Sequence, residues 1–189
     1  YEDESWERDY VGDPSIVQDG GGTYWMFYEA ANWSWNVAQI GVATSTNGLD
    51  WARVQTTPVL GAGAPGEWDE LWVLDPMVIT DSGTFRMWYS GFDAGWTRQI
   101  GIATSPDGIH WTRDTAHNPV FSPDPGQWDD GNVSNHFVLH DGDYWMWYTS
   151  NGRIGLVTST DGLNWNRFLV DPVLTPGLRG QWGQPVVDF

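Results

Sequence analysis

The chain has 189 residues, of which 40% are hydrophobic and 15% aromatic, so it is long enough and apolar enough to bury a sizeable core. Its 25 acidic residues outnumber 8 basic ones, which gives a formal net charge of -17 and excludes nucleic acids and anionic membranes as expected partners. The absence of cysteine excludes disulfides, thiolate metal sites and a cysteine nucleophile. A secreted or periplasmic location is compatible with this composition.

The first of three similar units covers about residues 1–62. It contains an aromatic segment, YWMFY at 24–28, followed by QIGVATSTNGLDW at 39–51 and then by Pro-Val-Leu. Segments that are this short, rich in β-branched and aromatic residues and separated by Gly, Asn, Asp and Pro are typical of β-strands. No helix is expected.

The second unit, about residues 63–122, repeats the same parts as FRMWY, QIGIATSPDGIHW and Pro-Val-Phe. Its strands are predicted near residues 75–80, 84–90, 99–105 and 110–114. In each unit an Asn-Gly or Asp-Gly pair separates the third and fourth predicted strands: Asn47-Gly48, Asp107-Gly108 and Asp161-Gly162. Because such pairs supply residues with positive φ, a tight hairpin is predicted at each.

The third unit, about residues 123–177, contains YWMWY and RIGLVTSTDGLNW, and residues 178–189 are interpreted as the start of a fourth. A four-stranded antiparallel sheet repeated about every 60 residues predicts β-propeller blades, because such a sheet buries both faces only between two neighbours. We therefore expect residues 1–189 to form a single, partial, all-β propeller domain.

The expected ring is incomplete, because propellers typically have about four to eight blades. Either further blades of a longer chain or additional copies of this chain, as a homo-oligomer, are expected to complete it. Tryptophans at matching positions are interpreted mainly as packing between blades: Trp6, Trp68 and Trp128 before the first strands, and Trp51, Trp111 and Trp165 at the opening of the fourth.

Polar residues occupy equivalent positions in the predicted first strands: Asp13-Pro14, Asp75-Pro76, Asn135-His136 and, in the tail, Gln184-Pro185. The first strand of each propeller blade lines the central channel, so these side chains are expected to converge there. Proline is tolerated in this strand because the strand is a sheet edge.

Two carboxylates that converge in a channel suit glycosyl transfer, in which one acts as base or nucleophile and the other acts as acid or orients the sugar. Two like charges close together raise the pKa of one partner, which gives one residue type two roles. The alternative is structural, with Asp13 and Asp75 capping loop backbone at the strand entrance.

Two longer segments, GDPSIVQDGGGTYWMFYEA and LDPMVITDSGTFRMWYSG, and the repeated IGxATSxDGxxW resemble the five-bladed β-propeller glycosidases, the superfamily of arabinanases, β-xylosidases, invertases and levansucrases. The resemblance covers nearly the whole chain. It implies a funnel-shaped active site with a base or nucleophile, a second Asp that orients substrate or stabilises the transition state, and a Glu general acid. By position, Asp13 matches the first and Asp75 the second.

The general acid of that pattern has no match in the third unit, which has Asn135 and His136 at the corresponding place. Glu29 is the best substitute, because it follows the aromatic strand where the other units have Ser or Thr. Glu67 and Glu70, on the loop before Asp75, are further candidates.

Substrate contacts are expected from Asn135, His136, Trp68 and Trp128, because amides and imidazoles bind sugar hydroxyls and indoles stack on sugar faces. The alternative for His136 is simple packing in the strand. No cofactor is required and no metal ligand is assigned. Acidic turns such as Asp141-Gly142-Asp143 and Asp129-Asp130 offer oxygen ligands for Ca²⁺, although none has the spacing of a recognised calcium loop.

Three functions remain open at this point. The first is a glycoside hydrolase acting on an oligo- or polysaccharide, ranked above a phosphorylase because the Arg residues are dispersed and Lys is absent. The second is a non-catalytic, lectin-like propeller assembled as an oligomer. The third is a structural or protein-binding propeller module.

Overall fold

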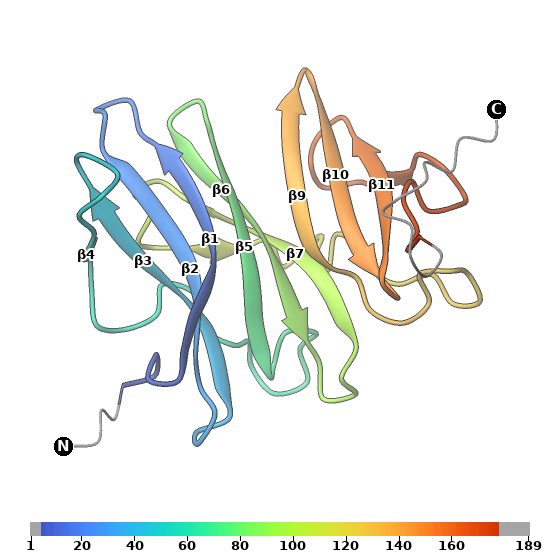
Figure 1. Ribbon diagram of the computed structural model, residues 1–189, viewed down its shortest axis with the longest axis horizontal. Helices are drawn as coiled ribbons and strands as arrows, with labels where there is room; N and C mark the ends of the chain where they lie inside the picture. The colour runs from blue at the N-terminus through green and yellow to red at the C-terminus, as the bar shows by residue number, and fades with distance from the viewer. Residues whose placement is uncertain (1–4, 178–189) are drawn as a thin grey trace.

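The computed structural model describes residues 5–177 as three four-stranded antiparallel sheets, which confirms the predicted blade fold (Figure 1). The first sheet contains β1 (Tyr10–Gln18), β2 (Tyr24–Asn32), β3 (Val37–Ser45) and β4 (Ala52–Arg53). The second contains β5 (Trp72–Asp81), β6 (Thr84–Phe92), β7 (Arg98–Ser105) and β8 (Thr112–Arg113). The third contains β9 (Ser134–Asp141), β10 (Asp143–Ser150), β11 (Arg153–Ser159) and β12 (Asn166–Arg167). Each is a meander in which sequential strands are neighbours.

The fourth strands are shorter than the sequence predicts. Residues 110–114 were expected to form one, whereas β8 contains only Thr112 and Arg113. The connection that precedes each fourth strand is also longer than a two-residue hairpin. In it, Gly48 has a φ of 75° but Asn47 is not in the left-handed region; instead the Asn47 side-chain oxygen accepts the backbone N–H groups of Leu49 and Asp50 (both 2.9 Å). Hydrogen bonds to the Asn47 side chain therefore stabilise this turn, which has one residue with positive φ where the prediction had two.

Apolar side chains pack between adjacent sheets and form the core. Between the first and second blades, Phe27 and Val42 meet Met87 and Tyr89. Between the second and third blades, a second group of buried side chains does the same: Trp88, Ile100, Ile102, Val138, Tyr144, Met146 and Val157. Each sheet is therefore stabilised by its neighbours, as blade packing requires.

Each blade repeats one cluster of a tryptophan, an acid, a tyrosine and an arginine. In the second blade the buried Asp69 carboxylate accepts hydrogen bonds from Tyr89 (2.9 Å) and Arg113 (2.8 Å), and the Trp68 ring lies 5.4 Å from the Tyr89 ring. The matching residues are Trp128, Asp129, Tyr148 and Arg167 in the third blade, and Trp6, Glu7, Tyr28 and Arg53 in the first. This cluster ties the entry of each blade to its second and fourth strands.

The glycine of the third strand is a consequence of this packing. A Cβ added to Gly101 would overlap the Trp68 ring, and a Cβ added to Gly155 would overlap the Tyr148 ring. The repeated Ile-Gly pair therefore reflects close approach of an aromatic ring to the backbone rather than a turn.

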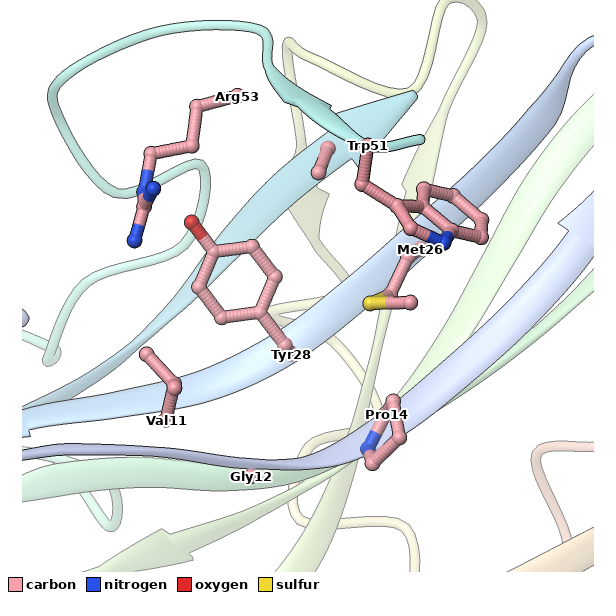
Figure 2. A pocket seen from close by; sticks show the side chains of 8 residues that line it. Val11, Gly12, Pro14, Met26, Tyr28, Trp51 and Arg53 are labelled. Atoms are coloured by element: carbon pink, nitrogen blue, oxygen red, sulfur yellow. The ribbon is translucent and has the colours of Figure 1, made fainter. Parts of the chain in front are cut away.

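Two sheet faces have no neighbouring sheet among the described residues. On the first blade, Met26, Tyr28, Trp51 and Arg53 line part of a cavity of about 420 Å³ (Figure 2). On the third blade, Phe168 packs against Trp145 and remains 53% exposed. Such faces are the ones that further blades would cover, so completion of the ring stays a prediction. The segment expected to begin a fourth unit, 178–189, lies outside the described residues.

Replacing Gly101 with Ala tests the packing of the indole on the third strand. The added methyl group must displace the partly buried Trp68 ring, so Gly101→Ala is expected to destabilise the fold by about 1–3 kcal/mol. The matched control is Gly20→Ala, because a Cβ there meets nothing within 4 Å. Urea unfolding of the two variants measures the difference, and equal stabilities would contradict this account.

Candidate active site

The equivalent position of each inner strand has left-handed backbone. Asp13, Asp75 and Asn135 have φ values of 46°, 49° and 44°. At each of these positions the pairing with the second strand is interrupted, as in the shift of register between Gly12 and Ser15. A bulge of this kind bends the strand and redirects a side chain.

Asp and Asn are the non-glycine residues that tolerate left-handed backbone best. The series Asp13, Asp75, Asn135 therefore has a backbone cause, which the sequence alone did not reveal. This cause does not choose between carboxylate and amide, because both satisfy the bulge. The backbone conformation therefore does not explain why Asp13 and Asp75 are carboxylates and not amides.

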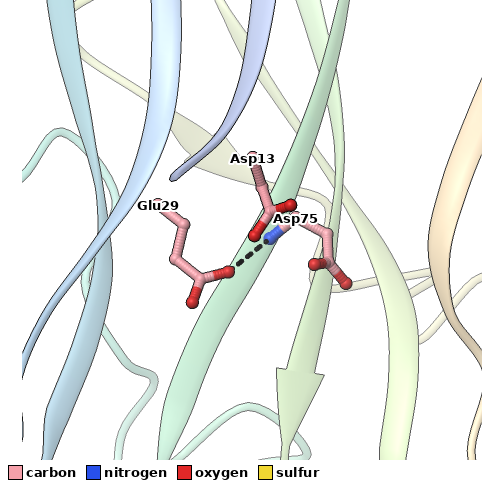
Figure 3. A group of neighbouring side chains, drawn as sticks. All are labelled: Asp13, Glu29 and Asp75. Atoms are coloured by element: carbon pink, nitrogen blue, oxygen red, sulfur yellow. Dashed lines mark hydrogen bonds between the residues drawn. The ribbon is translucent and has the colours of Figure 1, made fainter. Parts of the chain in front are cut away.

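Three carboxylates meet between the first and second blades. Asp13 on β1, Glu29 on β2 and Asp75 on β5 each bring one carboxylate oxygen within 4.8 Å of those of the other two (Figure 3). A cavity of about 350 Å³ opens beside Asp13 and Asp75 on the inner strands. Its lining runs across all three blades: Asp13, Pro14, Ser15, Ile16, Asp75, Pro76, Met77, Val78, Asn135, His136 and Phe137. The expected convergence of Asp13, Asp75, Asn135 and His136 is thus present.

Asp75 is held by donors from two blades. Its Oδ2 accepts a hydrogen bond from Ser90 Oγ (2.7 Å), another from the backbone N–H of Asn135 (3.1 Å), and forms an ion pair with Arg98. All of these groups favour a charged carboxylate in a fixed orientation. Asp75 is 6% exposed, so the arginine compensates for the cost of burying its charge.

Glu29 is in the opposite situation. It is 7% exposed, and its one hydrogen bond among the described residues is a long one (3.4 Å) from the backbone N–H of Asp75. Burial first, and then the negative charges of Asp75 and Asp13, raise the pKa of Glu29 to about 7. Glu29 is not among the residues that line the cavity, and its carboxylate lies next to Asp13 and Asp75 (Figure 3).

Asp13 is the most exposed of the three carboxylates. Its Oδ2 accepts a hydrogen bond from the Tyr10 hydroxyl (3.0 Å), and this bond raises the pKa of Tyr10 to about 12. Tyr10 therefore remains a donor to Asp13 at neutral pH. Nothing in the sequence repeat pointed to Tyr10, because the contact depends on how the bulge turns the strand.

His136 lines the cavity but is only 7% exposed. Burial lowers the pKa of His136 to about 4, so the ring is neutral at physiological pH. Neither ring nitrogen hydrogen-bonds to another residue of the described segment. Asn135 contributes its backbone N–H to Asp75, while its side-chain oxygen accepts from Ser134 Oγ (3.0 Å).

The other predicted site residues lie elsewhere. Trp68 and Trp128 pack against Tyr89 and Tyr148 in the repeated blade clusters and do not line the cavity beside Asp75. Glu67 and Glu70 accept backbone N–H groups of their own loop, from Ala64 (3.0 Å) and Gly66 (2.6 Å), as loop caps do. Gln184 lies outside the described residues.

Two residues that hold the site, Ser90 and Arg98, were not assigned to it from the sequence. Ser90 occupies the position in the second unit that Glu29 occupies in the first, and nothing in the sequence distinguishes Arg98 from the other dispersed arginines. Their contact with Asp75 crosses from β6 and β7 to β5, so it follows from sheet register and not from a local motif.

Asp13, Glu29 and Asp75 are also the one group of acids among residues 5–177 whose oxygens are close enough to share a metal ion. Arg98 is already paired with Asp75, which reduces the negative charge that this group offers to a cation. Of the acidic turns considered for Ca²⁺, Asp129 is engaged by Tyr148 and Arg167.

Comparison with known proteins places this geometry in a structural context. No protein-family model matches the sequence. An uncharacterized protein of Mycobacterium tuberculosis is 30% identical over 146 residues, which are 74% of this chain and 46% of that protein. The chain thus spans about half the length of the curated relatives that it matches.

Solved structures with a similar fold are glycoside hydrolases. Zg3597, a family 117 glycoside hydrolase of the marine bacterium Zobellia galactanivorans, superposes with a TM-score of 0.75 at 18% identity, over 88% of this chain and 57% of that one. A glycosyl hydrolase from Bacteroides ovatus gives a TM-score of 0.69 at 22% identity, over 87% of this chain and 50% of that one. The chain therefore has a glycosidase-type fold, and at these identities the likeness establishes the fold alone.

Burial of an acid with a raised pKa predicts a specific pH dependence of stability. The folded-state pKa of Glu29, about 7, lies above its ordinary value of 4.5, so the folded protein retains a proton that the unfolded chain releases between these values. Stability contributed by this proton is present below about pH 4.5 and is lost as the pH rises to about 7. Across this window the wild type is expected to lose about 2 kcal/mol relative to Glu29→Gln.

Urea unfolding at a series of pH values measures this difference. The Gln side chain keeps the shape of Glu29 and cannot ionise, so it is the matched control. Parallel stability curves for the two proteins would contradict a raised Glu29 pKa.

Proposed function

We propose that this protein is a glycoside hydrolase whose reaction uses Glu29 and Asp13. The observation that carries the proposal is the pair of unlike carboxyl groups, Glu29 buried with a raised pKa and Asp13 exposed, whose oxygens lie within 4.8 Å of each other beside a cavity on the inner strands. Two carboxyls whose environments separate their pKa values are the arrangement that glycoside hydrolysis needs.

Glu29 serves as the general acid. A carboxyl with a pKa of about 7 remains partly protonated at neutral pH and gives its proton to the departing glycosidic oxygen. Asp75 serves as a positioning residue, because Ser90, Arg98 and the Asn135 N–H hold its carboxyl group in place next to Glu29. Its charge also contributes to the raised Glu29 pKa.

Asp13 serves as the nucleophile. Carboxyl groups about 5–5.5 Å apart are typical of retaining glycosidases, whereas inverting enzymes need about 6.5–9.5 Å to admit a water. One oxygen of Asp13 lies within 4.8 Å of one oxygen of Glu29, so the two carboxyl groups are close enough for the shorter separation, and we propose retention on this basis. Asp13 bonds to the anomeric carbon as the bond to the leaving oxygen breaks and Glu29 protonates that oxygen. Water then attacks the same carbon, gives a proton to Glu29 and releases Asp13.

The likeness to glycoside hydrolases supports this proposal at the level of fold. One similar structure, at a TM-score of 0.62 and 22% identity over 87% of this chain and 50% of that one, comes from work on family 130 mannoside phosphorylases that includes hydrolases of β-1,2-mannosidic linkages. Hydrolysis is favoured over phosphorolysis here, because Arg98 is already paired with Asp75.

Leaving-group chemistry tests the assignment of Glu29 and Asp13. Glu29→Gln is expected to lower kcat at least about 100-fold on 4-nitrophenyl glycosides, and far less on 2,4-dinitrophenyl glycosides, whose departure needs no acid. Asp13→Asn is expected to abolish turnover of both, because it removes the nucleophile. A panel of neutral hexosides and pentosides supplies the substrates.

Asp141→Asn is the matched control, since Asp141 ends the inner strand of the third blade outside the cavity lining. It should leave activity unchanged. If Asp13→Asn retains full activity, the proposed nucleophile is wrong. If sugars bind without any turnover, the lectin-like alternative replaces the hydrolase.

The anomeric configuration of the first-formed product tests whether Asp13 acts as a nucleophile, with retention, or as a base, with inversion. Proton NMR during early turnover is expected to show the same anomer as the substrate. Formation of the opposite anomer would assign Asp13 as a base that activates water.

A further inference from the structure

A row of aromatic side chains lies at the blade ends beside the carboxylates. It consists of Tyr10, Trp33, Trp72 and Trp96, whose successive ring centroids are 6.4, 6.0 and 4.9 Å apart. Trp33 is 52% exposed, Trp96 is 51% exposed and Tyr10 is 38% exposed. We call this set the aromatic row.

The aromatic row is continuous with the candidate active site at two points. The hydroxyl of Tyr10, at one end of the row, donates to Asp13. At the other end Trp96 packs on Phe92 at 5.9 Å, and Arg98, the partner of Asp75, lies 5.2 Å from the Phe92 ring centre. The row therefore adjoins the carboxylates through Tyr10, although none of its four residues lines the cavity beside Asp75.

The backbone of Trp96 gives independent reason to look for a role. Trp96 has a φ of 63°, a region that bulky residues avoid. The corresponding hairpins of the first and third blades place Asn36 (54°) and Asn151 (48°) there, which are residue types suited to it. The second blade thus has a strained, half-exposed tryptophan where Asn would fit, and such strain is common at ligand sites.

We propose that the aromatic row binds successive units of a neutral oligosaccharide chain that extends from the carboxylates. This inference rests on the proposed hydrolase function and names its substrate class. Indole and phenol rings present flat apolar faces that stack on the C–H faces of pyranose rings.

Charge decides between neutral and acidic glycans. The protein carries a net charge of -17, and the acids Asp9 and Asp93 lie in the segments that hold the row. The Arg98 guanidinium is already ion-paired with Asp75, so it is not available to bind an acidic sugar. A uronic acid or sulfated chain would be repelled here, whereas a neutral chain would not.

Binding is tested in a Glu29→Gln background, which separates it from turnover. Isothermal titration uses neutral cello-, manno- and xylo-oligosaccharides from two to six sugars, with hexagalacturonate as the charged comparison. Affinity for at least one neutral series is expected to rise with length. Trp33→Ala and Trp96→Asn are each expected to lower hexasaccharide affinity about tenfold, which is a loss of about 1.4 kcal/mol.

Trp35→Ala is the matched control, because Trp35 is 53% exposed in the same β2–β3 hairpin as Trp33 but makes no ring contact with the row among the described residues. It should bind as the parent does. Trp96→Asn should also have an unchanged or higher Tm, since Asn relieves the left-handed strain. A structural role for Trp96 predicts the reverse, a lower Tm and unchanged binding.

The outcomes separate this inference from the proposed function. Length-independent binding, tighter binding of hexagalacturonate, no binding by any neutral series, or full affinity in both Trp33→Ala and Trp96→Asn overturns the row as a binding site. If aryl glycosides are still hydrolysed in that case, the hydrolase proposal stands without it. If the aromatic row binds oligosaccharides but none is hydrolysed, the binding site is supported and the hydrolase proposal is wrong.

Discussion

The left-handed bulge in the inner strand of each blade is the constraint on which the site depends. It interrupts pairing with the second strand at Asp13, Asp75 and Asn135 and turns these side chains toward the neighbouring blade. Without it, strand alternation alone would set where they point. The bulge also brings the Asn135 N–H to Asp75 and the Asp75 N–H to Glu29, so the backbone of each blade donates to an acid of the preceding one.

The same repeat produces two kinds of acidic residue. The acids of the blade clusters, such as Asp69 and Asp129, are fully buried and paired with tyrosine and arginine, so they serve the fold. Of the three site carboxyls, only Asp75 has an arginine partner among the described residues, while Glu29 receives a single long hydrogen bond. The unequal supply of donors separates the three site carboxyls chemically, and this inequality is what a hydrolytic reaction requires.

The sequence was sufficient for the blade, because its periodic strands, Gly turns and tryptophans are local signals that agree with one another. It was also sufficient to bring Asp13 and Asp75 together, since equivalent positions converge in a propeller, but it offered Glu29 only as a substitute for a missing acid. The sequence did not predict that Arg98, Tyr10 or the aromatic row would lie at the site, because their contacts depend on sheet register and hairpin conformation. Trp68 illustrates the limit: residue type indicated sugar stacking, but the ring fills the space above Gly91 and Gly101.

The central claim is that Glu29 is held protonated near neutral pH by burial and by the charges of Asp13 and Asp75. Carbon-13 NMR titration of the Glu29 side-chain carboxyl, assigned by its loss in Glu29→Gln, tests this directly. The account predicts a midpoint at a pH of about 7, moving lower in Asp75→Asn, which removes one of the charges that raise the pKa. A midpoint near 4.5, the ordinary value for glutamate, would contradict it.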